Sequence, residues 1–144
     1  SAVLVQLAAP QQCTAEDRAA IQRQGPGSAA DSFPGLTAEC GKSSWSVFGG
    51  WKHDKFNACL TRKVGVSSGC SQCFSRAGEY SFKNCKAACL RSWCSEKCLS
   101  CSEKFFPQVT ECARVRGTRA FSLRQGVRDF RRTSTACRAA AVHC

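Results

Sequence analysis

Cysteine is the residue that most constrains how this chain folds, because 13 of its 144 residues are cysteines. Seven of them lie between Cys70 and Cys101, most only three to five residues apart. Such density in a small chain is typical of a disulfide framework formed in an oxidising compartment. Every cysteine is a candidate for this framework: Cys13, Cys40, Cys59, Cys70, Cys73, Cys85, Cys89, Cys94, Cys98, Cys101, Cys112, Cys137 and Cys144.

The length and apolar content fit one domain, which we predict to span residues 1–144. No apolar run approaches the roughly 20 residues that cross a bilayer, so we expect no transmembrane segment. The chain begins at Ser1 and contains no methionine, as expected after removal of a targeting segment. We divide it into N-terminal helices with a loop (1–65), a cysteine-rich helical centre (66–106) and a basic C-terminal helix (107–144).

Local signals in the N-terminal segment predict helices separated by a loop. Thr14 followed by two acids resembles a capping box and predicts a helix over 15–24, with Cys13 at its entrance. The glycine- and serine-rich stretch 25–35 is typical of a loop, whose far end Cys40 would hold. Between residues 44 and 63 the apolar spacing predicts a short helix and then a longer one, broken at Gly49-Gly50 and stopped by Gly65.

The cysteine-rich centre has helical spacing throughout. One helix is expected over 70–77, ended by Gly78, and Ser81 can cap a second. The second pattern runs on to Pro107 as one helix or, with a bend near 92–95, as a helical hairpin. The predicted fold is therefore all-α: a small disulfide-rich helical domain with a bridged helical hairpin and long loops.

Disulfides explain these cysteines better than a metal does. Cysteines four apart on one helix can face cysteines four apart on its neighbour, so we expect Cys85 and Cys89 to bond two of Cys94, Cys98 and Cys101. Longer-range partners such as Cys70 or Cys73 remain open.

A zinc site built from the C-x-x-C pairs 70–73 and 98–101 would leave three intervening cysteines unexplained, and neither pair follows the strand that a redox motif needs. We therefore predict no metal and no cofactor. Thirteen is odd, so one thiol lacks a partner within the chain or bonds elsewhere, and Cys144 is the natural choice.

The positive charge is concentrated near the C-terminus. The chain has a net charge of +11, and eight arginines with one acid lie within 113–144. Apolar residues from Leu123 to Cys144 recur every three or four positions, which predicts a helix with one buried seam; a β-hairpin turning at 124–126 is the alternative. This basic surface suits binding to an acidic protein or to anionic lipid. The competing interpretation is a solvated face without a partner.

Nucleic acid is not expected as a partner, because an oxidising compartment rarely holds it and no aromatic residues interleave with the arginines. The candidate partner-binding residues are the arginines Arg119, Arg124, Arg128, Arg131 and Arg132 and the aromatic anchors Trp45, Phe48, Trp51, Phe105 and Phe106. Core packing is the competing role for each aromatic.

Catalytic motifs are missing from the sequence. The two histidines, His53 and His143, lie in no nucleophile elbow or metalloprotease motif, and His143 and Cys144, being adjacent on a helix, would point in different directions. We therefore predict that the protein is not an enzyme.

One pattern resembles a known family. The order C-x-x-C-F (70–74), N-C-K-x-x-C (84–89) and W-C-S-x-x-C-L-x-C (93–101) is similar to a cysteine-rich module of predicted proteins from dinoflagellate algae and related alveolates, and the match runs from Phe56 to Cys101. The resemblance implies no catalytic residues. It implies an algal lineage in which the thylakoid lumen is one oxidising compartment for a small subunit beside a photosystem and its light-harvesting antenna.

The functional hypothesis is a non-catalytic accessory or linker subunit that binds a larger, membrane-embedded assembly from within an oxidising compartment. The algal resemblance implies that this compartment is the thylakoid lumen. The alternatives are a secreted basic protein that acts on anionic membranes and a lipid-binding carrier, since helical disulfide-rich domains can enclose apolar cavities.

Overall fold

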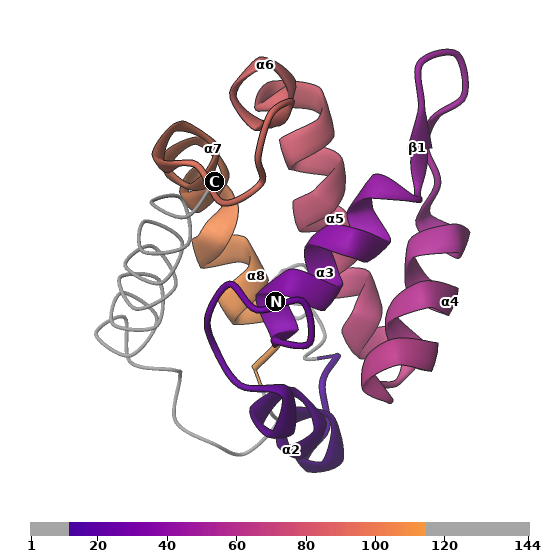
Figure 1. Cartoon of the computed structure of the whole chain (residues 1–144). Helices are drawn as coiled ribbons and strands as arrows, with labels where there is room; N and C mark the ends of the chain where they lie inside the picture. Colours follow the sequence, from indigo (N-terminus) through magenta and orange to yellow (C-terminus); the bar gives the residue numbers. More distant parts are fainter. Residues whose placement is uncertain (1–11, 115–144) are drawn as a thin grey trace, which may run out of the picture.

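The computed structural model describes residues 12–114 and shows a mainly helical, disulfide-rich domain (Figure 1). This confirms the predicted fold class. In chain order the elements are α2 (Ala15–Gln24), α3 (Phe33–Lys42), β1 (Trp45–Ser46), β2 (Gly50–Trp51), α4 (His53–Val64), α5 (Ser68–Asn84), α6 (Lys86–Cys89), α7 (Glu96–Ser102), the 3-10 helix η1 (Glu103–Phe105) and α8 (Phe106–Cys112).

The core lies where α3, α4 and α5 meet. Phe56 and Leu60 of α4 and Val66 of the following turn are completely or almost completely buried there. Gly65 ends α4 in the left-handed conformation (φ 86°), which glycine adopts without strain, so the predicted stop is confirmed. The edge-to-face pair of Phe33 and Phe74, with centroids 5.0 Å apart, closes the core beside α3.

Helix α2 begins and ends where the sequence predicts. Thr14 and Asp17 form a complete capping box, with the Asp17 amide donating to Thr14 Oγ1 (3.1 Å) and the Thr14 amide donating to Asp17 Oδ2 (2.9 Å). The Cys13–Cys70 disulfide ties this entrance to α5, as expected for Cys13. A backbone bond from the Gln12 amide to the Cys112 carbonyl (3.0 Å) brings α8 to the same place.

The predicted bridged hairpin is present. Disulfide Cys89–Cys98 joins α6 to α7, and Cys85–Cys101 joins α7 to the junction of α5 and α6. The chain turns just before Ser95, which caps α7. Cys94 is disulfide-bonded as well. The cysteines of the two C-x-x-C pairs form separate disulfides: Cys70 bonds Cys13 and Cys73 bonds Cys112, whereas Cys98 and Cys101 bond within the bridged hairpin. Cys70 and Cys73 therefore do not share a metal site with Cys98 and Cys101.

Three boundary predictions in the central and N-terminal segments are wrong. α5 continues through Gly78 and Ser81 to Asn84, because Gly78 packs against a tryptophan ring and Ser81 hydrogen-bonds Ser102 across the domain (3.0 Å). The predicted loop ends early, since Ser32 caps α3 by accepting from the Gly35 amide (3.1 Å). Cys40 accordingly lies within α3, where it bonds Cys59 of α4.

The short helix expected before Gly49-Gly50 is instead an antiparallel β-hairpin, in which Trp45 pairs with Trp51 and Ser46 with Gly50. The preceding helical segment ends at Phe105, just before Pro107, and Pro107 occupies the first turn of α8, a position that suits proline; α8 ends at Cys112. The predicted C-terminal helix, with Cys137 and Cys144, lies outside the described residues.

Candidate functional site

The hairpin between α3 and α4 carries the most exposed apolar side chains in the described part of the chain. Phe48 at its tip has 102% of its reference exposure and Val47 has 73%. Figure 1 shows the β1 hairpin extending beyond the helices at one end of the molecule. The tip is closed by a hydrogen bond from the Gly49 amide to Ser46 Oγ (2.8 Å). An apolar pair is thus presented on an ordered turn.

The neck of the hairpin is fixed from both sides. Disulfide Cys40–Cys59 joins the helices that precede and follow it. The buried Ser44 donates through Oγ to the Cys40 carbonyl (2.5 Å), and the Ser44 carbonyl accepts from the Lys52 amide (2.7 Å). The tip therefore stands on a rigid base, which limits the conformational entropy that binding would remove.

An aromatic pair with a lysine supports β1. The rings of Trp45 and Phe82 lie 5.5 Å apart, and Lys86 Nζ lies 5.1 Å and 4.4 Å from their centroids. These distances are within the range of cation–π attraction. Because Phe82 belongs to α5 and Lys86 to α6, the hairpin lies beside the end of α5 from which the bridged turn continues.

Trp51 supports β2 by packing inward. Its ring lies 5.4 Å from that of Phe56, and its Nε1 donates to Ser75 Oγ (3.2 Å). A Cβ placed on Gly78 would come within 2.3 Å of Trp51 Cη2, so only glycine allows this close approach of the ring to α5.

A hydrogen-bonded chain follows from Trp51 through α5. His53 Nδ1 lies 2.7 Å from Ser75 Oγ, and His53 Nε2 lies 2.6 Å from Glu79 Oε2. A carboxylate only accepts, so Nε2 carries the proton, and in the neutral imidazole Nδ1 accepts from the Ser75 hydroxyl. The hydrogen bond from His53 is the main reason why the pKa of Glu79 lies below its ordinary value, and Lys83, 3.3 Å from the other carboxylate oxygen, lowers that pKa further.

This serine, histidine and glutamate combination has the residue types of a hydrolytic triad, but its geometry is that of an anchor. Ser75 has 0% exposure, and its Oγ already accepts from Trp51 Nε1. A nucleophilic oxygen needs a path along which a substrate carbonyl can approach. The chain of hydrogen bonds instead holds β2 and the start of α4 against α5.

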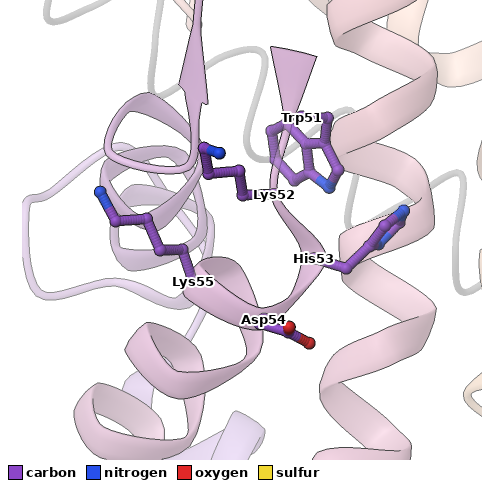
Figure 2. A pocket seen from close by; sticks show the side chains of 5 residues that line it. All are labelled: Trp51, Lys52, His53, Asp54 and Lys55. Carbon is purple, nitrogen blue, oxygen red and sulfur yellow. The ribbon is translucent and has the colours of Figure 1, made fainter. Parts of the chain in front are cut away.

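The segment after β2 lines an open depression formed by Trp51, Lys52, His53, Asp54 and Lys55. Figure 2 shows the Lys52 and Lys55 side chains extending to one side of this segment, while Trp51 and His53 turn toward α5 and Asp54 points away from the lysines. Lys52 also reaches the tip, because its Nζ lies 3.4 Å from the position of a Cβ built on Gly49. The depression is therefore the basic flank of the hairpin.

Cys13, Asp17 and Cys70 have potential ligand atoms within 4.8 Å of one another. The two sulfurs form a disulfide, and the Asp17 carboxylate accepts from the Ser67 amide (2.7 Å), the Ser67 hydroxyl (2.7 Å) and the Thr14 amide. Burial alone would raise the pKa of Asp17, but its hydrogen bonds to Ser67 and Thr14 outweigh burial and lower it. This cluster joins α2 to α5 and leaves no donor for a metal.

The aromatic residues predicted as anchors differ in how far they reach solvent. Trp45, Trp51 and Phe105 are half-buried, and Phe105 stacks on Tyr80 with centroids 5.1 Å apart. Phe106 is 37% exposed, far less than Phe48. The predicted arginines Arg119, Arg124, Arg128, Arg131 and Arg132 lie outside the described residues.

Two exposed apolar residues were not among the predicted site residues: Val47 and Leu90, the latter 67% exposed in the bridged turn. The Gly49-Gly50 pair after two apolar residues was the signal for Val47, because Gly-Gly favours a tight hairpin turn. No such sequence signal marks Leu90, because its spacing from neighbouring apolar residues is that of a buried helix face.

Searches with the chain matched no family model, no curated protein and no solved structure. Among residues 12–114, no helix is long and apolar enough to span a membrane.

Proposed function

We propose that this protein is a non-catalytic accessory or linker subunit that attaches to a larger, membrane-embedded assembly through its hairpin end. By hairpin end we mean Val47 and Phe48 at the tip, the Trp45–Phe82–Lys86 group beside them and the basic flank formed by Lys52 and Lys55. The observation that carries the proposal is the full exposure of Phe48 on a turn whose base is cross-linked.

The energetics of exposure support a binding role for the tip. Burying an aromatic or branched aliphatic side chain contributes roughly 1.5–3 kcal/mol, and folding here leaves Phe48 and Val47 without that contribution. Exposed aromatic residues on a rigid support are effective binding anchors, because little conformational freedom remains to be lost. The anchored geometry of Ser75 and His53 supports the non-catalytic part of the proposal.

The compartment and the assembly follow from two different arguments. The cross-linked fold is consistent with an oxidising extracellular or lumenal compartment. The resemblance to the algal cysteine-rich module favours the thylakoid lumen, and hence a photosystem with its light-harvesting antenna as the assembly. The C-terminal arginines would add long-range attraction to an acidic face of that assembly.

The test is native purification from the source cells after mild solubilisation of their membranes. Comigration of the protein with a pigmented complex on a density gradient supports the proposal, whereas recovery only in the medium refutes it. Salt-stripped membranes should then rebind the recombinant protein, and the variant V47S/F48S should rebind at least tenfold more weakly. L90S, which removes a similarly exposed apolar side chain elsewhere, is the matched control and should rebind normally.

The contribution of the arginines is tested in the same assay. The triple reversal R124E/R128E/R131E should abolish rebinding if the basic C-terminal segment takes part in docking. Unchanged rebinding would exclude that segment and leave the hairpin end as the attachment site.

A further inference from the structure

The apolar tip is small compared with a protein interface. An aromatic side chain exposes about 150–250 Å² when free, whereas a stable protein–protein interface buries about 800 Å² on each partner. Phe48 and Val47 reach only part of that area, and the exposed residues next to them, Ser46, Gly49 and Lys52, are polar or small. A small apolar projection surrounded by polar residues is better suited to a lipid surface, which can adapt to its shape, than to a protein interface.

The charges around the tip are positive. Residues 43–53 contain no carboxylate; of three exposed lysines, Lys52 lies within this segment and Lys42 and Lys55 lie just outside it in the sequence. Lys86 lies over the rings of Trp45 and Phe82, which brings a fourth ammonium group to the base of the hairpin. Basic residues that flank an apolar insertion are the pattern of proteins bound at anionic membrane interfaces.

Three carboxylates on the helices packed around the hairpin do little to cancel this charge. Glu79 of α5 is held by His53 and Lys83, and Glu39 of α3 is paired with Lys63 at 3.0 Å. Asp54 is exposed at the start of α4, but it points away from Lys52 and Lys55 (Figure 2). The surface around the tip therefore carries net positive charge and is attracted to a negatively charged surface.

The two tryptophans of the hairpin lie at one level behind the tip. Trp45 and Trp51 are paired across the strands, one register step behind Ser46 and Gly50. Both rings pack onto neighbouring aromatic side chains, Trp45 on Phe82 and Trp51 on Phe56, and Trp51 Nε1 donates to Ser75. The tryptophans therefore brace the hairpin, which leaves the apolar tip and the neighbouring Lys52 to meet a membrane surface.

We infer that the hairpin tip inserts into the anionic lipid interface of the bilayer that holds the assembly, with Phe48 and Val47 at the acyl boundary and the lysines at the headgroups. This inference rests on the proposed function, since it names what the hairpin end touches. Insertion is shallow and fixes the orientation of the domain on the membrane.

The test uses the full chain with its disulfides intact and vesicles of two compositions. One contains phosphatidylcholine alone, and the other contains 70% phosphatidylcholine with 30% phosphatidylglycerol; binding is measured by cosedimentation at about 0.1 M salt, where exposed charges still interact across about 10 Å. The wild-type protein should bind the anionic vesicles. V47S/F48S should bind them about tenfold more weakly, a loss equivalent to about 1.4 kcal/mol, and K52E/K55E should also weaken binding.

Two variants separate tip insertion from simple charge attraction and from a fitted pocket. L90S should bind like the wild type, because Leu90 belongs to the bridged turn and not to the tip. F48W should bind at least as tightly, since a lipid interface accepts the larger ring, whereas a shaped protein pocket would reject it.

Equal vesicle binding by V47S/F48S and wild type would overturn the inference, because the basic residues alone would then account for binding. If V47S/F48S lost rebinding to stripped membranes but not to vesicles, the tip would contact a protein, and the proposed function would stand without the lipid contact. Vesicle binding that depends on the tip, without comigration with any complex, would support insertion and refute the linker role. Unchanged urea unfolding of V47S/F48S shows that the comparison concerns binding rather than folding.

Discussion

Two glycines face the same tryptophan ring across very different gaps, which makes the anchoring of the hairpin testable. A Cβ on Gly78 of α5 would lie 2.3 Å from Trp51 Cη2, whereas a Cβ on Gly41 of α3 would lie 3.9 Å from the same atom. The first distance is a severe overlap and the second is ordinary contact. We predict that Gly78→Ala destabilises the protein and that Gly41→Ala does not.

The magnitudes follow from opposing contributions to the free energy of unfolding. Alanine in a helix interior is favoured over glycine by about 1 kcal/mol. Overpacking against Trp51 costs about 1–3 kcal/mol, and displacing its ring would also break the hydrogen bond to Ser75, worth about 1 kcal/mol. Gly78→Ala should therefore lower stability by about 1–3 kcal/mol, while Gly41→Ala should raise it by up to about 1 kcal/mol.

Urea unfolding at neutral pH with the disulfides intact measures both changes, and near-ultraviolet circular dichroism reports whether the tryptophan environment is altered. In a Trp51→Leu background the overlap is gone, so Gly78→Ala should become neutral or stabilising, and the double-mutant cycle isolates the contact. If Gly78→Ala were as stable as Gly41→Ala with an unchanged dichroism spectrum, the ring would not be held against α5, and the argument for a rigid hairpin base would fail.

Two further predictions concern the framework beneath the hairpin. Asp17→Asn should lower stability by roughly 1–3 kcal/mol at pH 7, because the new amide group meets the donors of Thr14 and Ser67. Because folding lowers the pKa of Asp17, the stability that its carboxylate contributes is present above the unfolded pKa and is lost as pH falls through the folded pKa. Urea unfolding between pH 7 and pH 2 should therefore show that the free energy of unfolding falls less steeply with acid in the variant than in the wild type. Identical slopes of stability against pH would contradict this. Replacing Cys13 and Cys70 by alanine removes a cross-link over a separation of 57 residues and should lower the free energy of unfolding by about 4 kcal/mol, against about 2.6 kcal/mol for Cys89 and Cys98 with a separation of 9. Guanidinium unfolding without reductant measures both losses. A reversed order would show that local strain outweighs chain entropy.

Sequence patterns predicted those parts of the fold that depend on neighbours in the chain. The capping box at Thr14 located α2, and the spacing of Cys85, Cys89, Cys98 and Cys101 located the bridged turn, because three- and four-residue steps place side chains on one helical face. Both signals are satisfied within a few turns of helix.

The errors arose where distant contacts decide the structure. Gly78 reads as a helix stop, yet α5 passes through it because Trp51, 27 residues earlier, needs the space that its missing Cβ leaves. Trp45 and Phe48 fit helical spacing, but Trp45 is held in a strand by pairing with Trp51 and by Phe82 and Lys86. Phe48 was predicted as an anchor because it is aromatic. Its complete exposure depends on the β-hairpin, in a segment for which the apolar spacing predicts a helix.

The disulfide framework also explains why the hairpin can remain outside the core. In residues 12–114 the buried apolar cluster is small, and its members include Cys13, Cys40, Cys59 and Cys70, so cross-links supply stability that a larger domain would draw from buried aliphatic and aromatic side chains. A fold stabilised in this way does not need Phe48 inside. Cys40–Cys59 belongs to this core and joins the two helices that precede and follow the hairpin, so the same bond that holds α3 to α4 also fixes the base from which the hairpin projects. The framework and the binding surface are therefore linked, and removing this disulfide should weaken vesicle binding as well as stability.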